Sequence, residues 1–243
     1  MDRRLVSALI FSVTALLAST ASAKVKEEFE RIVPFEPGGS FRIENVNGSI
    51  DIETWNEGTV RIQAEKEAGS QEALDGIEIL VEGSGSDVSV KTVHRRRHDG
   101  GQVSYRVFLP EEARVAVETV NGAVSVTGIH GSVQAESVNG GLKLESIDGE
   151  VSAETTNGSI QTSYRRAGDG RHHFETTNGS VRISLPSDAG GHIEAETSNG
   201  SIDVDFPMTV TRSGRRHLEG SFGSGASAFE IETVNGSVKI LPN

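Results

Sequence analysis

The chain has 243 residues, with 35 acidic residues against 23 Lys and Arg, so its formal net charge is −12. It contains no cysteine, which excludes disulfides, thiol catalysis and thiolate metal sites. The negative charge and the aromatic content of 5% argue against nucleic-acid binding. The length is sufficient for one domain or one continuous stack of repeats.

Residues 1–23 have the composition of a secretion signal peptide. Arg3 and Arg4 precede an apolar stretch over residues 5–18, and residues 21–23 (Ala-Ser-Ala) fit a small-residue cleavage site. The apolar stretch is too short for a stable transmembrane helix. We therefore expect export to the periplasm or the extracellular space, with no membrane span after cleavage.

Residues 24–112 are expected to form an irregular N-terminal β region. Strands are predicted over residues 60–66, 77–82, 88–93 and 103–109. Ser70 can cap a single helical turn over residues 70–74. Asn47 begins an Asn-Gly pair, and the next such pair comes 74 residues later. This region is therefore either a distinct sheet or a set of four degenerate coils.

Residues 113–243 are expected to form a regular β-repeat region that continues the first one. One phrase occurs seven times in the chain: alternating apolar residues, an Asn-Gly pair, and alternating apolar residues again. The seven asparagines are Asn47, Asn121, Asn139, Asn157, Asn178, Asn199 and Asn235. Alternation with a period of two predicts strands, and Asn-Gly supplies the positive φ angles that a tight turn between strands requires.

Equivalent positions of the seven copies keep their chemical character. The position four residues before each asparagine is always apolar. The position three residues before it is always Glu, namely Glu44, Glu118, Glu136, Glu154, Glu175, Glu196 and Glu232. Because side chains alternate along a strand, the apolar columns should form the core and the Glu column should face water.

Two all-β architectures fit this pattern. We favour a right-handed parallel β-helix or solenoid of 18–21 residues per coil with a ladder of Asn-Gly turns, because Ala135, Ala153 and Ala195 suit a narrow interior. The alternative is an antiparallel β meander, since Asn-Gly turns are common in hairpins. Residues 207–225 are expected to form a long excursion or a degenerate coil. The last copy of the repeat follows them and should be the terminal coil.

Several segments resemble a known family. They are Pro37-Gly38-Gly39, Asn47-Gly48-Ser49-Ile50 followed by Trp55, the strand end at Leu109-Pro110, and Leu218-Glu219-Gly220 with Gly223 and Gly225 before the last copy. With these features the chain resembles the bacterial putative-adhesin family with β-strand repeats, over nearly its whole length after residue 23. The resemblance implies an exported β-helical protein of the cell envelope without assigned catalytic residues, and the family name transfers little chemistry.

Catalytic signatures are absent from the sequence. No Gly-x-Ser-x-Gly elbow, Walker loop or His-Glu-x-x-His motif occurs. His172 and His173 are neighbours in a strand and should point to opposite faces, so they do not predict a metal site. We expect a non-catalytic protein without a cofactor. The alternative is a carbohydrate-active enzyme, a polysaccharide lyase or hydrolase on a β-helix, with its carboxylates among the many acidic residues.

The Glu column places like charges about 4.8 Å apart in a solenoid, where they repel one another. One explanation is screening by salt and by Lys143, Arg182 and Lys239 across the turn. The other is that the column binds a divalent cation such as Ca²⁺. The carboxylates for that cation hypothesis are Glu118, Glu136, Glu154, Glu175 and Glu196.

Nine arginines in three short runs are candidate ligands for an anionic polymer. They are Arg95, Arg96, Arg97, Arg165, Arg166, Arg171, Arg212, Arg215 and Arg216. If the edge opposite the Asn-Gly turns gathers them into one strip, that strip could hold envelope polysaccharide or lipid headgroups. A protein partner is an alternative to such a polymer. The simpler explanation is that the basic loops balance the charge of an acidic body. The expected function is an adhesin-like binding or scaffold role in the bacterial cell envelope.

Overall fold

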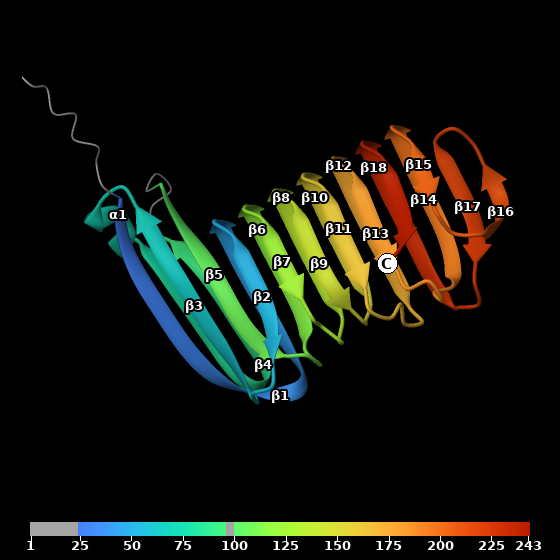
Figure 1. The fold of residues 1–243 in the computed structure, drawn as a ribbon. Helices are drawn as coiled ribbons and strands as arrows, with labels where there is room; N and C mark the ends of the chain where they lie inside the picture. The colour runs from blue at the N-terminus through green and yellow to red at the C-terminus, as the bar shows by residue number, and fades with distance from the viewer. Residues whose placement is uncertain (1–23, 96–99) are drawn as a thin grey trace, which may run out of the picture.

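The structure is a computed structural model that describes residues 24–95 and 100–243. The expected signal peptide and the pair Arg96 and Arg97 lie outside these residues. The described chain forms one elongated stack of 19 strands with one short helix, in which the coils lie side by side along one axis (Figure 1). None of the helices in the described part is long and apolar enough to cross a membrane.

One side of the stack carries the glutamate column and is called the Glu sheet here. In spatial order it contains β4 (Ile77–His94), β1 (Val25–Asn47), β6 (Arg114–Asn121), β8 (Val133–Asn139), β10 (Val151–Asn157), β12 (Arg171–Asn178), β18 (Ser227–Asn235), β14 (Gly191–Asn199), β17 (His217–Phe222) and β16 (Met208–Ser213). From β4 to β14 every pair is parallel, so the coils form a solenoid and the meander is wrong.

The other side of the stack is called the opposite sheet. In spatial order it contains β3 (Thr59–Ala68), β5 (Gly101–Pro110), β2 (Ile50–Trp55), β7 (Val124–Thr127), β9 (Leu142–Ile147), β11 (Ile160–Tyr164), β13 (Val181–Leu185), β19 (Val238–Pro242) and β15 (Ile202–Val204). Each regular coil contributes one strand to each sheet. The helical turn is confirmed as α1 (Gln71–Asp75), because the Ser70 hydroxyl caps it by accepting from the amide of Ala73.

The core lies between the two sheets and consists of the apolar columns. Ala135, Ala153 and Ala195 are completely buried, as expected for a narrow interior. A third inward column, two residues before each asparagine, is polar. Five of its hydroxyls donate to carbonyl oxygens of the adjacent coil, as Thr176 does to Gly158 at 2.8 Å, whereas the hydroxyl of Thr119 has no partner. The buried hydroxyl column therefore joins five of the turns to a neighbouring turn.

The seven asparagines form one continuous ladder, as the sequence predicted. In six hydrogen bonds of 2.8–2.9 Å, the side-chain amide of each asparagine after Asn47 donates to Oδ1 of the asparagine that precedes it in the stack. Their spatial order is Asn47, Asn121, Asn139, Asn157, Asn178, Asn235 and Asn199. The ladder thus runs through every copy of the repeat.

The expectation that these turns need glycine for its positive φ angles is wrong. Among the seven, only Gly48 has a positive φ, at 116°. The others are required because the turns stack so closely that no side chain fits between them. A Cβ at Gly140 would lie 1.9 Å from the carbonyl oxygen of Gly122, and one at Gly158 would lie 2.0 Å from that of Gly140.

The two ends of the stack differ from the expected order. The last coil, β18–β19, is not terminal, because it lies between β12–β13 and β14–β15. Residues 207–225 instead form the hairpin β16–β17, which extends the Glu sheet with antiparallel pairing. At the other end the first coil, β1–β2, lies between β4–β5 and β6–β7, and β3 pairs antiparallel with β1 and β5.

Candidate functional site

The outer face of the Glu sheet carries all seven glutamates in one straight column. Backbone register places them side by side in the order Glu44, Glu118, Glu136, Glu154, Glu175, Glu232 and Glu196. Lys91 of β4 stands beside the first and His217 of β17 beside the last. Because adjacent strands are about 4.8 Å apart, this is a line of closely spaced negative charges.

Basic side chains contact the glutamates near the ends of this column. Lys91 Nζ lies 2.5 Å from an oxygen of Glu44, and Arg42 Nη1 lies 2.8 Å from Glu118. At the far end, His217 Nδ1 lies 2.8 Å from Glu196. Neither Lys91 nor His217 follows from the repeat, since they belong to strands that do not carry it.

The four glutamates between these ends have weaker partners. Glu136 accepts a hydrogen bond of 2.8 Å from Gln134, and His173 Nε2 lies 4.0 and 3.8 Å from Glu154 and Glu175. Within the described chain, none of Glu136, Glu154, Glu175 and Glu232 forms an ion pair with Lys or Arg. The middle of the column therefore has no Lys or Arg to balance its carboxylates.

Glu232 shows the effect of this crowding. Partial burial and the negative charges of Glu175, Glu196 and Glu230 raise its pKa, although His173 opposes them. The shift follows from placing carboxylates in register, since each neighbour disfavours a further negative charge.

A groove of about 590 Å³ runs along the same face. Its lining combines the Glu column with the column just before each asparagine, and includes Glu118, Glu136, Val120 and Val138. The two valines are 40% and 43% exposed, and with Val46 they form a continuous exposed apolar row rather than isolated surface residues. The groove thus offers carboxylates and apolar methyl groups side by side along several coils.

The expected screening of this column by basic residues across the turn is wrong. Lys143, Arg182 and Lys239 belong to the opposite sheet, where Lys143 pairs with Glu145 at 2.9 Å and Lys239 with Asp203 at 3.4 Å. The turn carries the chain from one sheet to the other, so residues before and after it face opposite sides of the molecule.

Two histidines expected to point to opposite faces do so. His172 is 1% exposed in the core, where Tyr164 Oη lies 2.8 Å from its Nδ1, and His173 lies on the outer face. A different set, Glu194, Glu196 and His217, brings its ligand atoms within 4.8 Å of one another and could hold a metal ion. Only Glu196 of this set belongs to the carboxylates named from the sequence for a cation.

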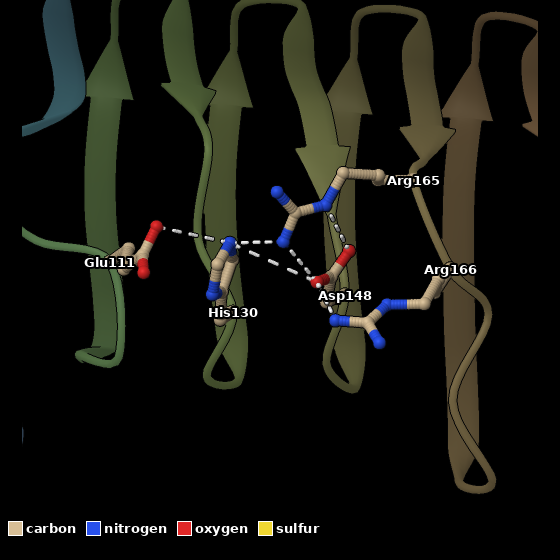
Figure 2. A network of polar contacts seen from close by, with 5 residues as sticks. All are labelled: Glu111, His130, Asp148, Arg165 and Arg166. Carbon is tan, nitrogen blue, oxygen red and sulfur yellow. Dashed lines mark hydrogen bonds and ion pairs between the residues drawn. The ribbon is translucent and has the colours of Figure 1, made fainter.

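Arg165 and Arg166 lie at the edge opposite the Asn-Gly turns, where both contact one carboxylate (Figure 2). Arg165 Nε lies 3.1 Å and Arg166 Nη2 lies 3.3 Å from Asp148, whose side chain is 9% exposed. Burial raises the pKa of Asp148, but Arg165, Arg166 and His130 outweigh it and hold the pKa below its usual value. His130 Nε2 in turn lies 3.3 Å from Glu111.

The structure does not gather the described arginines into one strip. Arg171 begins β12 and shares the edge of Arg165 and Arg166. Arg95 follows β4 at the edge of the Asn-Gly turns and pairs with Glu78 at 2.9 Å. Arg212, Arg215 and Arg216 lie in or beside the β16–β17 turn at the far end of the stack, where Arg212 pairs with Glu219 at 3.4 Å. Arg96 and Arg97 lie outside the described residues.

These coils match a known family over almost their whole length. The family model described as Toastrack DUF4097 matches residues 26–241. The chain belongs to the Toastrack family. Toastrack is a β-solenoid-like fold, in agreement with the stacked parallel coils. No curated protein matches this Toastrack chain.

A solved structure shows a similar fold. A putative cell adhesion protein from Clostridium sporogenes has a TM-score of 0.50 and 15% identity, and the match covers 89% of this chain and 100% of that one. A putative adhesin from Bacteroides fragilis has a TM-score of 0.35 and 10% identity, with coverage of 88% and 97%. At such identities the first likeness shows the Toastrack fold alone, and the second carries no further argument.

Four features of this Toastrack chain were not predicted from the sequence: the contacts of Lys91, His217 and Asp148, and the exposed column before the asparagines. Lys91, His217 and Asp148 act through contacts between distant segments, and no local motif marks them. The exposed column before the asparagines could have been found, because Val46, Val120, Val138 and Val234 share the outward parity of the glutamates.

Proposed function

We propose that this Toastrack chain is an exported, non-catalytic protein with an adhesin-like binding or scaffold role in the bacterial cell envelope. The groove of the Glu sheet is its main binding surface. The observation that carries this proposal is the uninterrupted pairing of a carboxylate column with an exposed valine and threonine column. A surface that repeats with every coil suits an extended ligand, because each coil offers the same contacts again.

The charge of the groove determines which partners suit it. Its middle glutamates have no Lys or Arg ion pair within the described chain, so the groove favours a cationic partner or one bridged by cations. The exposed valines favour a partner that also has apolar segments. Lipid headgroups with amines, polysaccharides bridged by divalent ions and basic protein segments meet these requirements.

An anionic polymer is a second candidate ligand, and it rests on a separate observation. Arg215 and Arg216 are exposed at the β16–β17 turn and form no ion pair within residues 24–95 and 100–243. Unpaired guanidinium groups bind phosphate and carboxylate groups well. Arg171 at the other edge has the same character. These residues would hold polysaccharide or lipid headgroups at two places rather than along one strip.

The carbohydrate-active enzyme is the remaining alternative. Hydrolysis of a glycosidic bond needs one protonated and one ionised carboxyl group at a defined place. Glu232 has a raised pKa and stands between Glu175 and Glu196, so it is the candidate for the protonated group, with either neighbour as the ionised one. However, the same spacing recurs at every coil, which suits repeated contacts better than a single reaction centre. Release of reducing ends from envelope polysaccharides would support the enzyme.

The proposal is tested in two steps. Residues 1–23 fused to a periplasmic reporter should direct its export, and cell fractionation should recover the protein in the periplasm, the envelope or the medium. The purified full chain should then be retained by at least one member of a panel of envelope polysaccharides and lipid vesicles, without cleaving it. Recovery in the cytoplasm, or retention by no member of the panel, contradicts the proposal.

A further inference from the structure

The last coil of the chain occupies a slot between two coils that precede it in the sequence. β18 pairs with β12 on one side and with β14 on the other, and β19 pairs with β13 and β15. Without residues 227–243, two parallel strand edges in each sheet would lose their partners. The slot is therefore a complete binding site for one coil.

A short connection leads the chain into this slot. Four residues, 223–226, join β17 on one side of β14 to β18 on its other side. They cross the chain at Gly190, where a Cβ on Gly225 would lie 2.1 Å from the Gly190 carbonyl oxygen and one on Gly190 would lie 2.3 Å from the Ser224 amide. The crossing is possible because both segments have glycine there.

The slot recognises its coil by register rather than by unique contacts. Glu232, Thr233 and Asn235 of β18 stand beside Glu175, Thr176 and Asn178 on one side, and beside the same residue types of β14 on the other. The asparagine ladder joins them on both sides with bonds of 2.9 Å. A second copy of β18–β19 would make the same contacts.

We propose that residues 227–243 exchange between copies of this chain, so that the slot of one molecule binds β18–β19 of another. Exchange of an identical element between protomers is a low-cost route to dimers, and a short, tight hinge favours it. Residues 223–226 are such a hinge. In the exchanged dimer, each hinge would leave its own molecule instead of crossing Gly190.

Cysteine pairs test this proposal directly, because the chain has no cysteine of its own. Ser180 and Ser237 come just before β13 and β19 and lie side by side, with the Ser237 amide 3.2 Å from Ser180 Oγ. One full chain carries Ser180→Cys and a second, with a different tag, carries Ser237→Cys. The two are mixed at high concentration, unfolded and refolded together, and then oxidised. We expect a disulfide-linked heterodimer with both tags.

The matched control uses a pair with the same geometry in coils that follow each other in sequence. The Ser180 amide lies 3.3 Å from Ser159 Oγ. A mixture of one chain with Ser159→Cys and another with Ser180→Cys should give at least about tenfold less heterodimer. Equal yields in the two mixtures would overturn the proposal, as would the absence of heterodimer from the first.

The hinge gives an independent test. Gly225→Ala, introduced into both chains of the first mixture, adds a Cβ that the closed crossing cannot accommodate. The fraction of heterodimer should therefore rise several-fold among folded molecules, as judged by size-exclusion chromatography. A folded variant with an unchanged or lower fraction contradicts the role of the hinge and of exchange.

Discussion

The side-chain amide of Asn235 donates a 2.9 Å hydrogen bond to Oδ1 of Asn178, although 57 residues separate them. Asn199 is much closer to Asn178 in sequence, yet it bonds to the far side of Asn235. Any copy of the repeat can stand beside any other, because every copy presents the same columns. Stacking order is therefore set by the connections between coils and not by the repeat itself.

The adjacent glycines Gly140 and Gly141 test the tight stacking of the turns. Gly140→Ala should destabilise the protein by about 1–3 kcal/mol, because its Cβ would lie 1.9 Å from the Gly122 carbonyl oxygen. Gly141→Ala should change stability by less than about 0.5 kcal/mol, since its Cβ meets the Ser159 carbonyl at an ordinary 3.4 Å. Urea denaturation followed by circular dichroism measures both. Equal effects of the two substitutions would show that close stacking does not require glycine at residue 140.

The burial of His172 in the core predicts a loss of stability in mild acid. Burial lowers its pKa below the usual 6.5, so the unfolded chain takes up the proton first as the pH falls. Its contribution is complete above about pH 6.5 and is lost as the pH falls through the folded value. His172→Phe, which restores the apolar column and can stack on Phe229, should flatten the dependence of melting temperature on pH below 6.5. An unchanged slope in this variant would refute the assignment to His172.

The raised pKa of Glu232 predicts an effect of pH on stability of the opposite sign. Its pKa is raised by burial and by neighbouring carboxylates, so the folded chain takes up this proton before the unfolded chain does. The contribution of this group to stability is present below the unfolded value near 4.5 and is lost as the pH rises through the folded value. Glu232→Gln should therefore raise the melting temperature at pH 7 and have less effect at pH 4. A lower melting temperature at pH 7 would mean that the carboxylate has a stabilising partner.

The sequence could predict the columns, the core and the asparagine ladder, because they depend on local alternation that repeats seven times. It could not predict that the β18–β19 coil is inserted, since identical columns fit in any order. It also could not separate the two explanations for the glycines, because a positive φ and a close contact both require the same residue. The expected screening of the Glu column by Lys143 is wrong because the turn carries the chain to the opposite sheet before Lys143 is reached.

The arginines divide into two groups with different expected effects. Arg165→Ser with Arg166→Ser should lower the melting temperature, because it leaves the Asp148 carboxylate, which is 9% exposed, without its cations. Arg215→Ser with Arg216→Ser should leave the melting temperature unchanged and weaken retention on an anionic polymer such as heparin. Differential scanning calorimetry and a salt gradient measure the two effects. If the second variant is retained as strongly as the unchanged chain, Arg215 and Arg216 do not bind the polymer.

Retention of isolated cell envelopes by the immobilised full chain tests the binding role of the Glu sheet most directly. The test variant is Glu136→Gln with Glu154→Gln in the middle of the groove, and the control is Glu53→Gln with Glu145→Gln, which removes the same charge from the opposite sheet. Both should fold. The account predicts at least about tenfold weaker retention for the groove variant alone, in line with the roughly 1.4 kcal/mol that a tenfold change represents. Equal retention by the groove variant and its control would contradict it.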